Sequence, residues 1–447
     1  MNGFIISGTN SGCGKTTISI GLMALFQELG YDVAPFKTGP DYIDPLFHSR
    51  VLNKPSYNLD GYMLSADKVR YLFAKHLQKT QLAIIEGVMG MYDGLGKDSL
   101  GSAHHLSQIL AIPNILIVSC QSLYQSVAAI VKGFATLKDD SNVKGVILNH
   151  VPSDSYYQFL KETIESQTGI ACVGYVPSNK EFALESRHLG LVQAEEVDSI
   201  DDKIELLKQT LKQTIDTDKL LEVTRIKQQC ETFIKPPKLD LSDLHIGVAY
   251  DKAFRFYYQN NLELLQELGA TLHYFSPLNE KSIPSNCNCL YIGGGYPEVF
   301  AKELSANEPM LKSIKEAAAK EMPIYAECGG LMYLTQAINQ LDETSNQMVG
   351  IFNARTQMTK RLNRFGYAEL TYNNTTTRCH EFHRSEIVDP PTPNYQLNYQ
   401  LEKKEKGKQW QCGLKKDNTL AGYAHVHFYS NFSFFEQIIA LWRRATI

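Results

Sequence analysis

Short apolar runs alternate with longer amphipathic stretches through the first half of the chain. Helical spacing of apolar residues marks Ile18–Leu29 and Ala103–Leu110. The runs between such stretches are rich in β-branched residues and short enough for strands; they are Phe4–Ser7, Val33–Phe36, Leu82–Glu86, Ile115–Ser119, Val146–Asn149 and Cys172–Val176. Because this alternation is typical of a parallel sheet covered by helices on both faces, it predicts an α/β fold. Ligands then bind at the carboxyl ends of the strands.

The pattern changes in the middle of the chain. Residues Ile200–Lys235 are polar, charge-rich and helical in spacing, and the prolines in Lys235–Lys238 cannot continue a helix. A second alternating unit then opens, with predicted strands at Ile246–Tyr250, Leu290–Ile292 and Ile324–Ala326. We therefore predict two doubly wound, mainly parallel α/β domains, residues 1–235 and 245–447, joined by a linker at 236–244.

Composition narrows the class of protein. The chain has 447 residues, of which 43% are hydrophobic and 21% charged, as in ordinary globular proteins. Its net charge is −4, without the basic block that a nucleic-acid or anionic membrane surface needs. No basic leader precedes the first strand, and the scattered cysteines match no zinc spacing. We expect a cytoplasmic protein that binds small molecules, with no nucleic-acid or membrane partner. The Asn- and Thr-rich segment Thr371–Thr377 is predicted to be a surface loop.

A glycine-rich loop, Gly8–Thr17, lies between the first predicted strand and the first helix. Backbone N–H groups in such a loop converge on phosphate oxygens, while a lysine reaches the outer phosphates and a hydroxyl binds Mg²⁺. The loop is one residue longer than the standard spacing, because Thr9 stands where the first glycine belongs. It predicts an ATP site made by Gly12, Gly14, Lys15, Thr16 and Thr17.

Acidic residues follow two neighbouring strands. Asp41 and Asp44 come after the second strand together with Lys37, and Glu86 ends the third. Each acid alone could equally be a cap or turn former. Mg²⁺ prefers carboxylate oxygens together with those of phosphate. The sequence therefore predicts a Mg²⁺ site of Thr16, Asp41, Asp44 and Glu86, with Lys37 as a cation that stabilises charge during phosphoryl transfer.

The second half carries a strand, a sharp turn and a helix in Ile324–Tyr333, with Cys328 at the turn. This is the nucleophile-elbow arrangement with cysteine in place of serine. A helix N-terminus beside the sulfur is expected to favour the thiolate. The upstream segment Leu290–Glu298 ends a strand in three glycines, which can aim N–H donors at an oxyanion. We expect Gly294 and Gly329 to supply these donors.

Two histidines near the C-terminus are candidate bases for Cys328. His425 and His427 lie two residues apart, and alternate residues on a strand share one face. Either imidazole can take the thiol proton on this reasoning. Class I amidotransferases place a glutamate two residues beyond the histidine. His427 occupies that position, so the orienting third residue is absent or differs.

Taken in order, these motifs resemble the cobyrinate a,c-diamide synthase family, a dethiobiotin synthetase-type P-loop domain fused to a class I-like glutamine amidotransferase. The segments His380–Ser385 and Tyr423–Phe428 complete the pattern. The resemblance implies a carbon–nitrogen ligase of cobalamin (vitamin B12) biosynthesis. Such an enzyme amidates the a and c acetates of cobyrinate, a corrinoid, through acyl phosphates, using ATP, Mg²⁺ and ammonia from L-glutamine. It further implies that Cys328 is the nucleophile and His425 its base, with His427 in a structural role.

Further residues are candidates for ligand contacts. Asn149 resembles an adenine-reading asparagine, although a strand-end cap is an equal interpretation. Tyr42 and Asp93, beside the metal acids, are candidates for contact with the substrate, and Tyr42 could equally pack a turn. The side chains that could hold substrate carboxylates, or else belong to a surface loop, are His380, His383 and Arg384.

Several alternatives stay open. The same chemistry could act on hydrogenobyrinate or on nickel-sirohydrochlorin. A regulatory or partitioning P-loop ATPase is a different class, but its signature lysine is replaced by Asn10. A catalytically inactive scaffold would not need Lys15, Cys328 and His425. A homodimer is possible.

Overall fold

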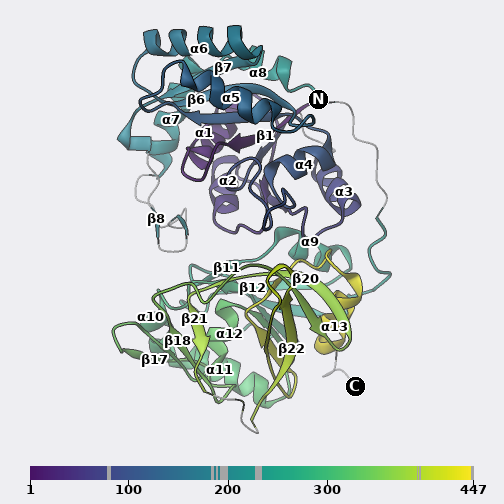
Figure 1. Cartoon of the computed structure of the whole chain (residues 1–447). Coiled ribbons are helices and arrows are strands. Elements are labelled where there is room, and N and C mark those ends of the chain that lie inside the picture. Colours follow the sequence, from purple (N-terminus) through teal and green to yellow (C-terminus); the bar gives the residue numbers. More distant parts are fainter. Residues whose placement is uncertain are drawn as a thin grey trace. The chain divides into compact units, whose positions relative to one another are not determined.

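The computed structural model describes residues 1–77, 82–182, 186–187, 190–191, 200–226, 234–389, 391 and 394–443. The chain forms two compact units, Met1–Ile234 and Lys235–Ile447 (Figure 1). Each unit contains its own large sheet.

The first unit is built on a seven-stranded sheet in the order β3-β2-β4-β1-β5-β6-β7. Every neighbouring pair in it is parallel. All six predicted strands lie in this sheet. Leu82–Glu86 has the predicted bounds, the other five have shifted ends, and the short edge strand β3 was not predicted. The strands are β1 (Asn2–Gly8), β2 (Val33–Thr38), β3 (Tyr57–Leu59), β4 (Leu82–Glu86), β5 (Asn114–Ser119), β6 (Val143–Val151) and β7 (Ala171–Pro177).

Helices cover both faces of this sheet. In β5, Ile115 and Ile117 pack into the core cluster that contains residues of α1 and α7, whereas Leu116 and Val118 pack with α5 and α6. Successive side chains of a strand point to opposite faces, so both faces must be apolar. The helices are α1 (Lys15–Glu28), α2 (Asp44–Leu52), α3 (Ala66–Leu77), α4 (Ala103–Leu110), α5 (Ser126–Thr136), α6 (Asp154–Thr168), α7 (Ile200–Thr214) and α8 (Thr217–Val223).

The charge-rich stretch in the middle of the chain contains α7 and α8. Residues 227–233, which were also predicted to be helical, lie outside the described residues. Residues 234–244 form no helix or strand. Within them Leu241 and Leu244 are buried, and the Leu241 N–H donates to the Leu268 carbonyl at 2.7 Å. The predicted linker is therefore held against the second unit at its end.

A ten-stranded sheet organises the second unit, in the order β12-β10-β13-β15-β24-β23-β22-β19-β20-β25. The pairs from β12 to β24 are parallel and the pairs from β24 to β25 are antiparallel. The strands are β10 (His245–Ala249), β12 (Thr271–Phe275), β13 (Cys289–Ile292), β15 (Ile324–Glu327), β19 (Arg364–Tyr372), β20 (Thr375–His383), β22 (Gln396–Lys403), β23 (Lys408–Lys416), β24 (Thr419–Gly422) and β25 (His425–Val426).

Smaller elements complete this unit. A two-stranded ribbon pairs β11 with β14, and a four-stranded sheet has the order β17-β16-β18-β21. These strands are β11 (Phe254–Phe256), β14 (Gly294–Gly295), β16 (Ala337–Asn339), β17 (Ser345–Gln347), β18 (Arg355–Met358) and β21 (Ser385–Ile387). The helices are α9 (Gln259–Glu267), α10 (Ala301–Ala306), α11 (Glu308–Ala319), α12 (Gly329–Leu334) and α13 (Phe432–Trp442).

The prediction of a surface loop at Thr371–Thr377 is wrong. This segment is the tip of the β19–β20 hairpin, in which Tyr372 pairs with Thr375. Asn373 and Asn374 form the two-residue turn with φ values of 45° and 62°. Asparagine tolerates this left-handed backbone, and two such residues in sequence suit the twist of a tight hairpin. Hence an Asn–Asn pair between threonines indicated a turn between two strands.

None of the helices in the described part of the chain combines the length and apolar character required to span a membrane.

Candidate active sites

The glycine-rich loop joins the end of β1 to the start of α1. Gly14 has φ 100°, and a Cβ there would lie 2.1 Å from Nδ2 of Asn149. That amide donates to the Cys13 carbonyl at 2.8 Å, while its oxygen accepts from the His150 N–H at 2.9 Å. Thus Asn149, near the end of β6, braces the loop from the neighbouring part of the sheet. Its contact with adenine stays a prediction.

Two side chains at the start of α1, Lys15 and Thr16, are arranged for phosphate and metal chemistry. Lys15 Nζ donates to the Asn10 carbonyl at 3.0 Å, which folds the lysine over the loop. Burial lowers the pKa of Lys15, with the nearby Lys37 acting in the same direction. Thr16 Oγ1 donates to Oε1 of Glu86 at 2.7 Å. Gly12 is exposed and Thr17 partly exposed at the same loop.

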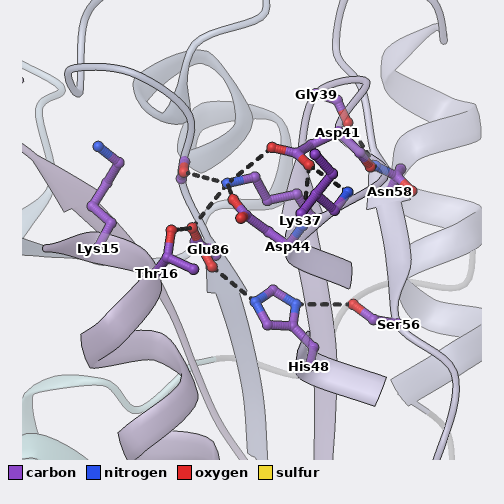
Figure 2. Close-up of polar contacts among 12 residues, drawn as sticks. Lys15, Thr16, Lys37, Gly39, Asp41, Asp44, His48, Ser56, Asn58 and Glu86 are labelled. Atoms are coloured by element: carbon purple, nitrogen blue, oxygen red, sulfur yellow. Dashed lines mark hydrogen bonds and ion pairs between the residues drawn. The ribbon is translucent and has the colours of Figure 1, made fainter. Parts of the chain in front are cut away.

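Lys37 lies among the three predicted metal acids (Figure 2). It is the register partner of Glu86 across the parallel pair β2 and β4, so their side chains lie on the same face. Its Nζ is 2.9 Å from Glu86 Oε1, 2.5 Å from Asp44 Oδ2 and 3.8 Å from Asp41 Oδ2. Figure 2 shows Lys15 pointing away from this cluster. Asp41 also caps the next turn, since its Oδ1 accepts from the Ile43 N–H at 2.8 Å.

Burial and charge act in opposite directions on this cluster. Burial opposes the charge of Lys37, but Asp44 and Glu86 outweigh it and raise the lysine pKa. Burial likewise opposes the charge of Glu86, yet Lys37 and His48 hold the glutamate pKa well below its usual value. By contrast, burial and the neighbouring carboxylates raise the pKa of Asp44. Lys37 and Glu86 therefore form a buried ion pair in which each favours the charge of the other.

The donor set can be compared with what Mg²⁺ requires. No group of three or more His, Cys, Asp or Glu residues in the described part of the chain is arranged to hold a metal by itself. The hydroxyl of Thr16 and the carboxylate of Glu86, already in contact, supply the hard oxygen donors that this ion takes alongside phosphate oxygens. The residues therefore fit Mg²⁺ bound together with a nucleotide.

His48 is a member of this cluster that the sequence analysis missed. It is buried on α2, with Nε2 at 2.8 Å from Glu86 Oε2 and Nδ1 at 3.1 Å from Ser56 Oγ. It therefore fixes the second oxygen of Glu86. The available signal was its spacing of four residues from Asp44, which puts both side chains on the same face once α2 forms.

Tyr42 and Asp93, the predicted substrate contacts, lie in loops that follow β2 and β4. Asp93 Oδ2 accepts from the Gly90 N–H at 2.9 Å, and the Asp93 N–H donates to the Gly90 carbonyl. This carboxylate therefore shapes the turn after β4. Tyr42 is partly buried. Contact of either residue with a substrate stays a prediction.

In the second unit Cys328 occupies the turn between β15 and α12. Its backbone has φ 48° and ψ −104°, a left-handed conformation that costs free energy for any residue with a Cβ. The Cys328 N–H donates to the carbonyl of Gly422, at the end of β24, at 2.7 Å. This is the strained strand–turn–helix geometry of a nucleophile elbow.

Cys328 and His425 meet at Gly294. A Cβ placed on Gly294 would lie 2.5 Å from Cε1 of His425 and 3.4 Å from Cβ of Cys328. Both side chains are buried, with 5% of Cys328 and 2% of His425 exposed. The structure thus brings together the thiol, the imidazole and the glycine loop.

The N-terminus of α12 acts on the Cys328 thiol in the expected direction, but other effects outweigh it. Burial raises the pKa of this thiol well above its ordinary value, and the charge of Glu298 acts in the same direction. The Gly329 N–H opposes the rise but does not outweigh it. A thiol with a raised pKa can act as a nucleophile only if a base takes its proton.

His425 and His427 do not share a strand face, contrary to the expectation from their spacing. Strand β25 ends at Val426, and the chain turns after it. The His427 ring packs 4.9 Å from that of Tyr258, and its Nδ1 accepts from the Tyr429 N–H at 3.3 Å. His427 is therefore part of the packing around this turn.

The predicted oxyanion donors belong to two backbone segments that pack closely. A Cβ on Gly329 would lie 2.8 Å from Cδ of Pro297 and 3.0 Å from the nitrogen of Gly295. Only glycine permits this approach of α12 to the glycine loop. Gly293 is already engaged, since its N–H donates to the Tyr257 hydroxyl at 2.7 Å. Donation by Gly294 and Gly329 to an oxyanion stays a prediction.

His380 and His383 lie on β20 and are buried, so assigning them to a surface loop is wrong. Burial lowers the pKa of His380 to about 3 and that of His383 to about 4. His383 stacks on Tyr423 with ring centroids 3.8 Å apart. Neutral, packed imidazoles are poorly suited to hold substrate carboxylates. Arg384 is partly exposed beside them.

Comparison of the sequence with known proteins identifies the family of the chain. Residues 4–192 match the CobQ/CobB/MinD/ParA nucleotide binding domain, and residues 245–432 match the CobB/CobQ-like glutamine amidotransferase domain. The chain is 42% identical over 447 residues to the cobyrinate a,c-diamide synthase of Clostridium tetani, covering 98% of this chain and 100% of the relative. It is 42% identical over 443 residues to that of Caldanaerobacter subterraneus, covering 96% and 95%. These full-length matches show that the chain belongs to the cobyrinate a,c-diamide synthase family.

Proposed function

We propose that this chain converts the a and c acetate carboxylates of cobyrinate to amides, with ATP as the activating and glutamine as the nitrogen-donating co-substrate. Its full-length relatives carry the name of this reaction. The observation that carries the proposal is the meeting of Cys328 and His425 at Gly294 in a chain that also has a complete P-loop. One polypeptide then contains a glutaminase centre and a carboxylate-activating centre.

The first unit activates the carboxylate. A carboxylate oxygen of the substrate attacks the γ-phosphorus of ATP, the bond to the bridging oxygen breaks, and ADP leaves. The product is an acyl phosphate. Ammonia then attacks the acyl carbon, phosphate leaves with the electron pair of the broken bond, and loss of a proton yields the amide. Activation is required because the carboxylate itself has no good leaving group.

Residues of the P-loop and of the acidic cluster support this transfer. Loop N–H groups from Gly12 to Thr17 bind the phosphates, and the Lys15 and Lys37 ammonium groups stabilise the charge on the γ-phosphate. Thr16 and Glu86 would hold Mg²⁺, with Asp41 and Asp44 as further oxygen donors. When bound, the ion neutralises charge on the phosphate oxygens.

The second unit releases ammonia from glutamine. Cys328 Sγ attacks the side-chain amide carbon, and His425 takes the thiol proton and passes it to the departing nitrogen. A thioester forms, ammonia leaves, and water then hydrolyses the thioester to glutamate. Backbone N–H groups of Gly294 and Gly329 would stabilise the oxyanion. Burial raises the pKa of the Cys328 thiol, so a base beside it would favour the attack, and His425 is the proposed base.

The experiment that tests the substrate is an amidation assay with ATP, Mg²⁺, glutamine and one tetrapyrrole at a time, read by mass spectrometry. Cobyrinate should show two successive acid-to-amide mass changes. Hydrogenobyrinate and nickel-sirohydrochlorin, the alternative substrates, should react more slowly at equal concentration. Amidation of either alternative in preference to cobyrinate would overturn the assignment. A homodimer and a cytoplasmic location stay predictions.

A further inference from the structure

The residue before the nucleophile is a buried glutamate that the sequence analysis assigned to no role. Glu327 ends β15, and 1% of it is exposed. Its Oε1 accepts from the Tyr325 hydroxyl at 2.8 Å and from the Val426 N–H at 3.3 Å, while Oε2 lies 3.4 Å from the Tyr291 hydroxyl. Burying a carboxylate costs much free energy unless the group is paired and hydrogen-bonded.

Glu327 also faces the base. Its Oε2 lies 3.7 Å from Nδ1 of His425. Among the described residues, His425 is the one ionisable cation partner within ion-pair distance of this carboxylate. The Val426 N–H bond ties Glu327 to the strand that carries His425, so the carboxylate and the imidazole are held together through the backbone.

The orientation of the imidazole gives this contact a direction. Cε1, the ring atom between the two nitrogens, lies against Gly294 next to Cβ of Cys328. Nδ1 is on the side of Glu327. A proton held on Nδ1 by the carboxylate would leave Nε2 with a lone pair for the Cys328 thiol proton. A histidine base needs this tautomer, and a carboxylate is the usual group that selects it.

The usual position of an orienting acid is taken by another residue here. Two residues beyond His425 stands His427, whose ring packs on Tyr258. Strand β15 ends beside β24, where Glu327 pairs with Gly422, and the chain runs from there to His425 within a few residues. The fold thus brings the residue before the nucleophile, instead of one after the histidine, to the imidazole.

We propose that Glu327 is the positioning residue of the glutaminase centre: its carboxylate accepts a hydrogen bond from the Nδ1–H of His425. This contact leaves the lone pair of Nε2 to take the proton of the Cys328 thiol. This inference rests on the proposed roles of Cys328 and His425. The other ionisable groups that interact with Glu327 stay neutral because burial raises their pKa values; they are Tyr257, Tyr291, Tyr325, Tyr399, Cys328 and Cys379. Of these, Tyr291 and Tyr325 donate hydrogen bonds to the carboxylate. His380, whose pKa burial lowers, lies opposite His425 on β20 and adds no positive charge at neutral pH.

The test compares Glu327→Gln with Tyr325→Phe in the full chain. Glu327→Gln keeps the shape of the side chain but removes its charge, and we expect kcat for glutamine hydrolysis to fall by about 10²–10⁴-fold with KM changed far less. Amidation driven by added ammonia should persist. Tyr325→Phe removes one hydrogen bond to the same carboxylate and should cost less than about tenfold. Equal losses in the two variants would mean that Glu327 serves only the packing of β15.

A spectroscopic readout keeps the inference testable if Glu327→Gln fails to fold. Nitrogen-15 spectra of histidine-labelled wild-type protein, with the His425 signals identified by their absence in His425→Gln, report which ring nitrogen carries the proton. We expect the proton on Nδ1, and an Nε2–H tautomer would overturn the proposal. The variant Cys328→Ala distinguishes a failure of the proposed nucleophile from a failure of the role proposed for Glu327. Glutamine hydrolysis surviving in that variant would refute the proposed nucleophile, whereas wild-type hydrolysis in Glu327→Gln beside an inactive Cys328→Ala would refute only the role of Glu327.

Discussion

The ammonium of Lys37 lies 2.9 Å from Oε1 of Glu86, and the two residues are register partners on adjacent parallel strands. A cation and an anion that are both buried cost much free energy unless each compensates the other. Thr16 and His48 complete the contacts of the glutamate. These contacts fix both oxygens of Glu86 and place Lys37 among the acids that are expected to face Mg²⁺.

Removing this lysine should destabilise the first unit. Lys37→Met leaves Asp44 and Glu86 buried without their cation, and breaking a buried pair in this way costs about 3–5 kcal/mol. Added Mg²⁺ should restore part of the loss, because it replaces the missing charge. Calorimetric unfolding with and without MgCl₂ measures both effects. The matched control is Lys212→Met, which breaks an exposed pair with Glu28 and should change stability by less than about 1 kcal/mol. Equal effects in the two variants would contradict this account of the cluster.

Replacing the P-loop lysine should stop synthesis whatever the nitrogen source. Lys15→Ala removes a charge that stabilises phosphoryl transfer, and we expect amidation to fall by at least about 10²-fold with glutamine or with ammonium chloride. Glutamine hydrolysis should continue. Lys132→Ala, on an exposed part of α5, is the control and should behave as wild type. Amide formation by Lys15→Ala at the wild-type rate would exclude activation at this loop.

The cysteine of the second unit should be required only for glutamine. Cys328→Ala removes the attacking sulfur, so glutamine-dependent amidation should be lost while ammonia-dependent amidation remains. Cys289→Ala, at a buried thiol of β13, should keep both activities. The measurement is the rate of amide formation with each nitrogen source. Loss of both activities in Cys328→Ala alone would show that the thiol does not act solely in nitrogen release.

Gly294 should not tolerate a side chain. In Gly294→Ala the new Cβ would lie 2.5 Å from Cε1 of His425, so the imidazole must move away from Cys328. We expect glutamine hydrolysis to fall by about 10²-fold or more. Gly133→Ala is the matched control, because a Cβ on this exposed residue of α5 meets no atom within 4 Å. It should stabilise the first unit by about 0.5–1 kcal/mol and leave hydrolysis unchanged. A fully active Gly294→Ala would refute the arrangement of the glutaminase centre.

Stability of the second unit should fall in mild acid. Burial lowers the pKa of His380 to about 3 and of His383 to about 4, from an ordinary value of 6.5. Below pH 6.5 these two imidazoles bind protons in the unfolded chain but stay neutral in the folded chain. The contribution of these two histidines to stability is therefore complete above that pH and declines toward about pH 4, by up to about 1.4 kcal/mol per pH unit for each histidine. Glu381, whose pKa burial raises to about 7, acts in the opposite direction and offsets part of this loss.

Urea unfolding at about pH 7.5 and about pH 5 measures this slope. Both tryptophans, Trp410 and Trp442, belong to the second unit, so their fluorescence reports its unfolding alone. The double variant His380→Gln/His383→Gln should show a shallower dependence on pH. An unchanged slope in that variant would mean that other groups cause the loss of stability.

Much of the architecture could be predicted because it depends on the local spacing of apolar and polar residues. The strand–helix alternation predicted the parallel sheet of the first unit, and the α/β class and the family are confirmed. The sequence did not predict the antiparallel half of the second sheet, because its strands are half-exposed and carry many polar residues. Those strands include Gln396–Lys403 and Lys408–Lys416. Such segments resemble loops unless their partner strands are known.

By itself the sequence predicted two α/β halves, a phosphate-binding loop and a sharp turn at Cys328, because each prediction depends on residues adjacent in the chain. Tertiary structure alone decided that Lys37 sits among the metal acids, that His48 joins Glu86, and that Glu327 faces His425. These contacts join residues far apart in sequence, and they depend on strand register, burial and side-chain orientation. The periodicity of apolar residues predicts which side chains are buried. Which buried side chains contact one another is determined only when the strands pair.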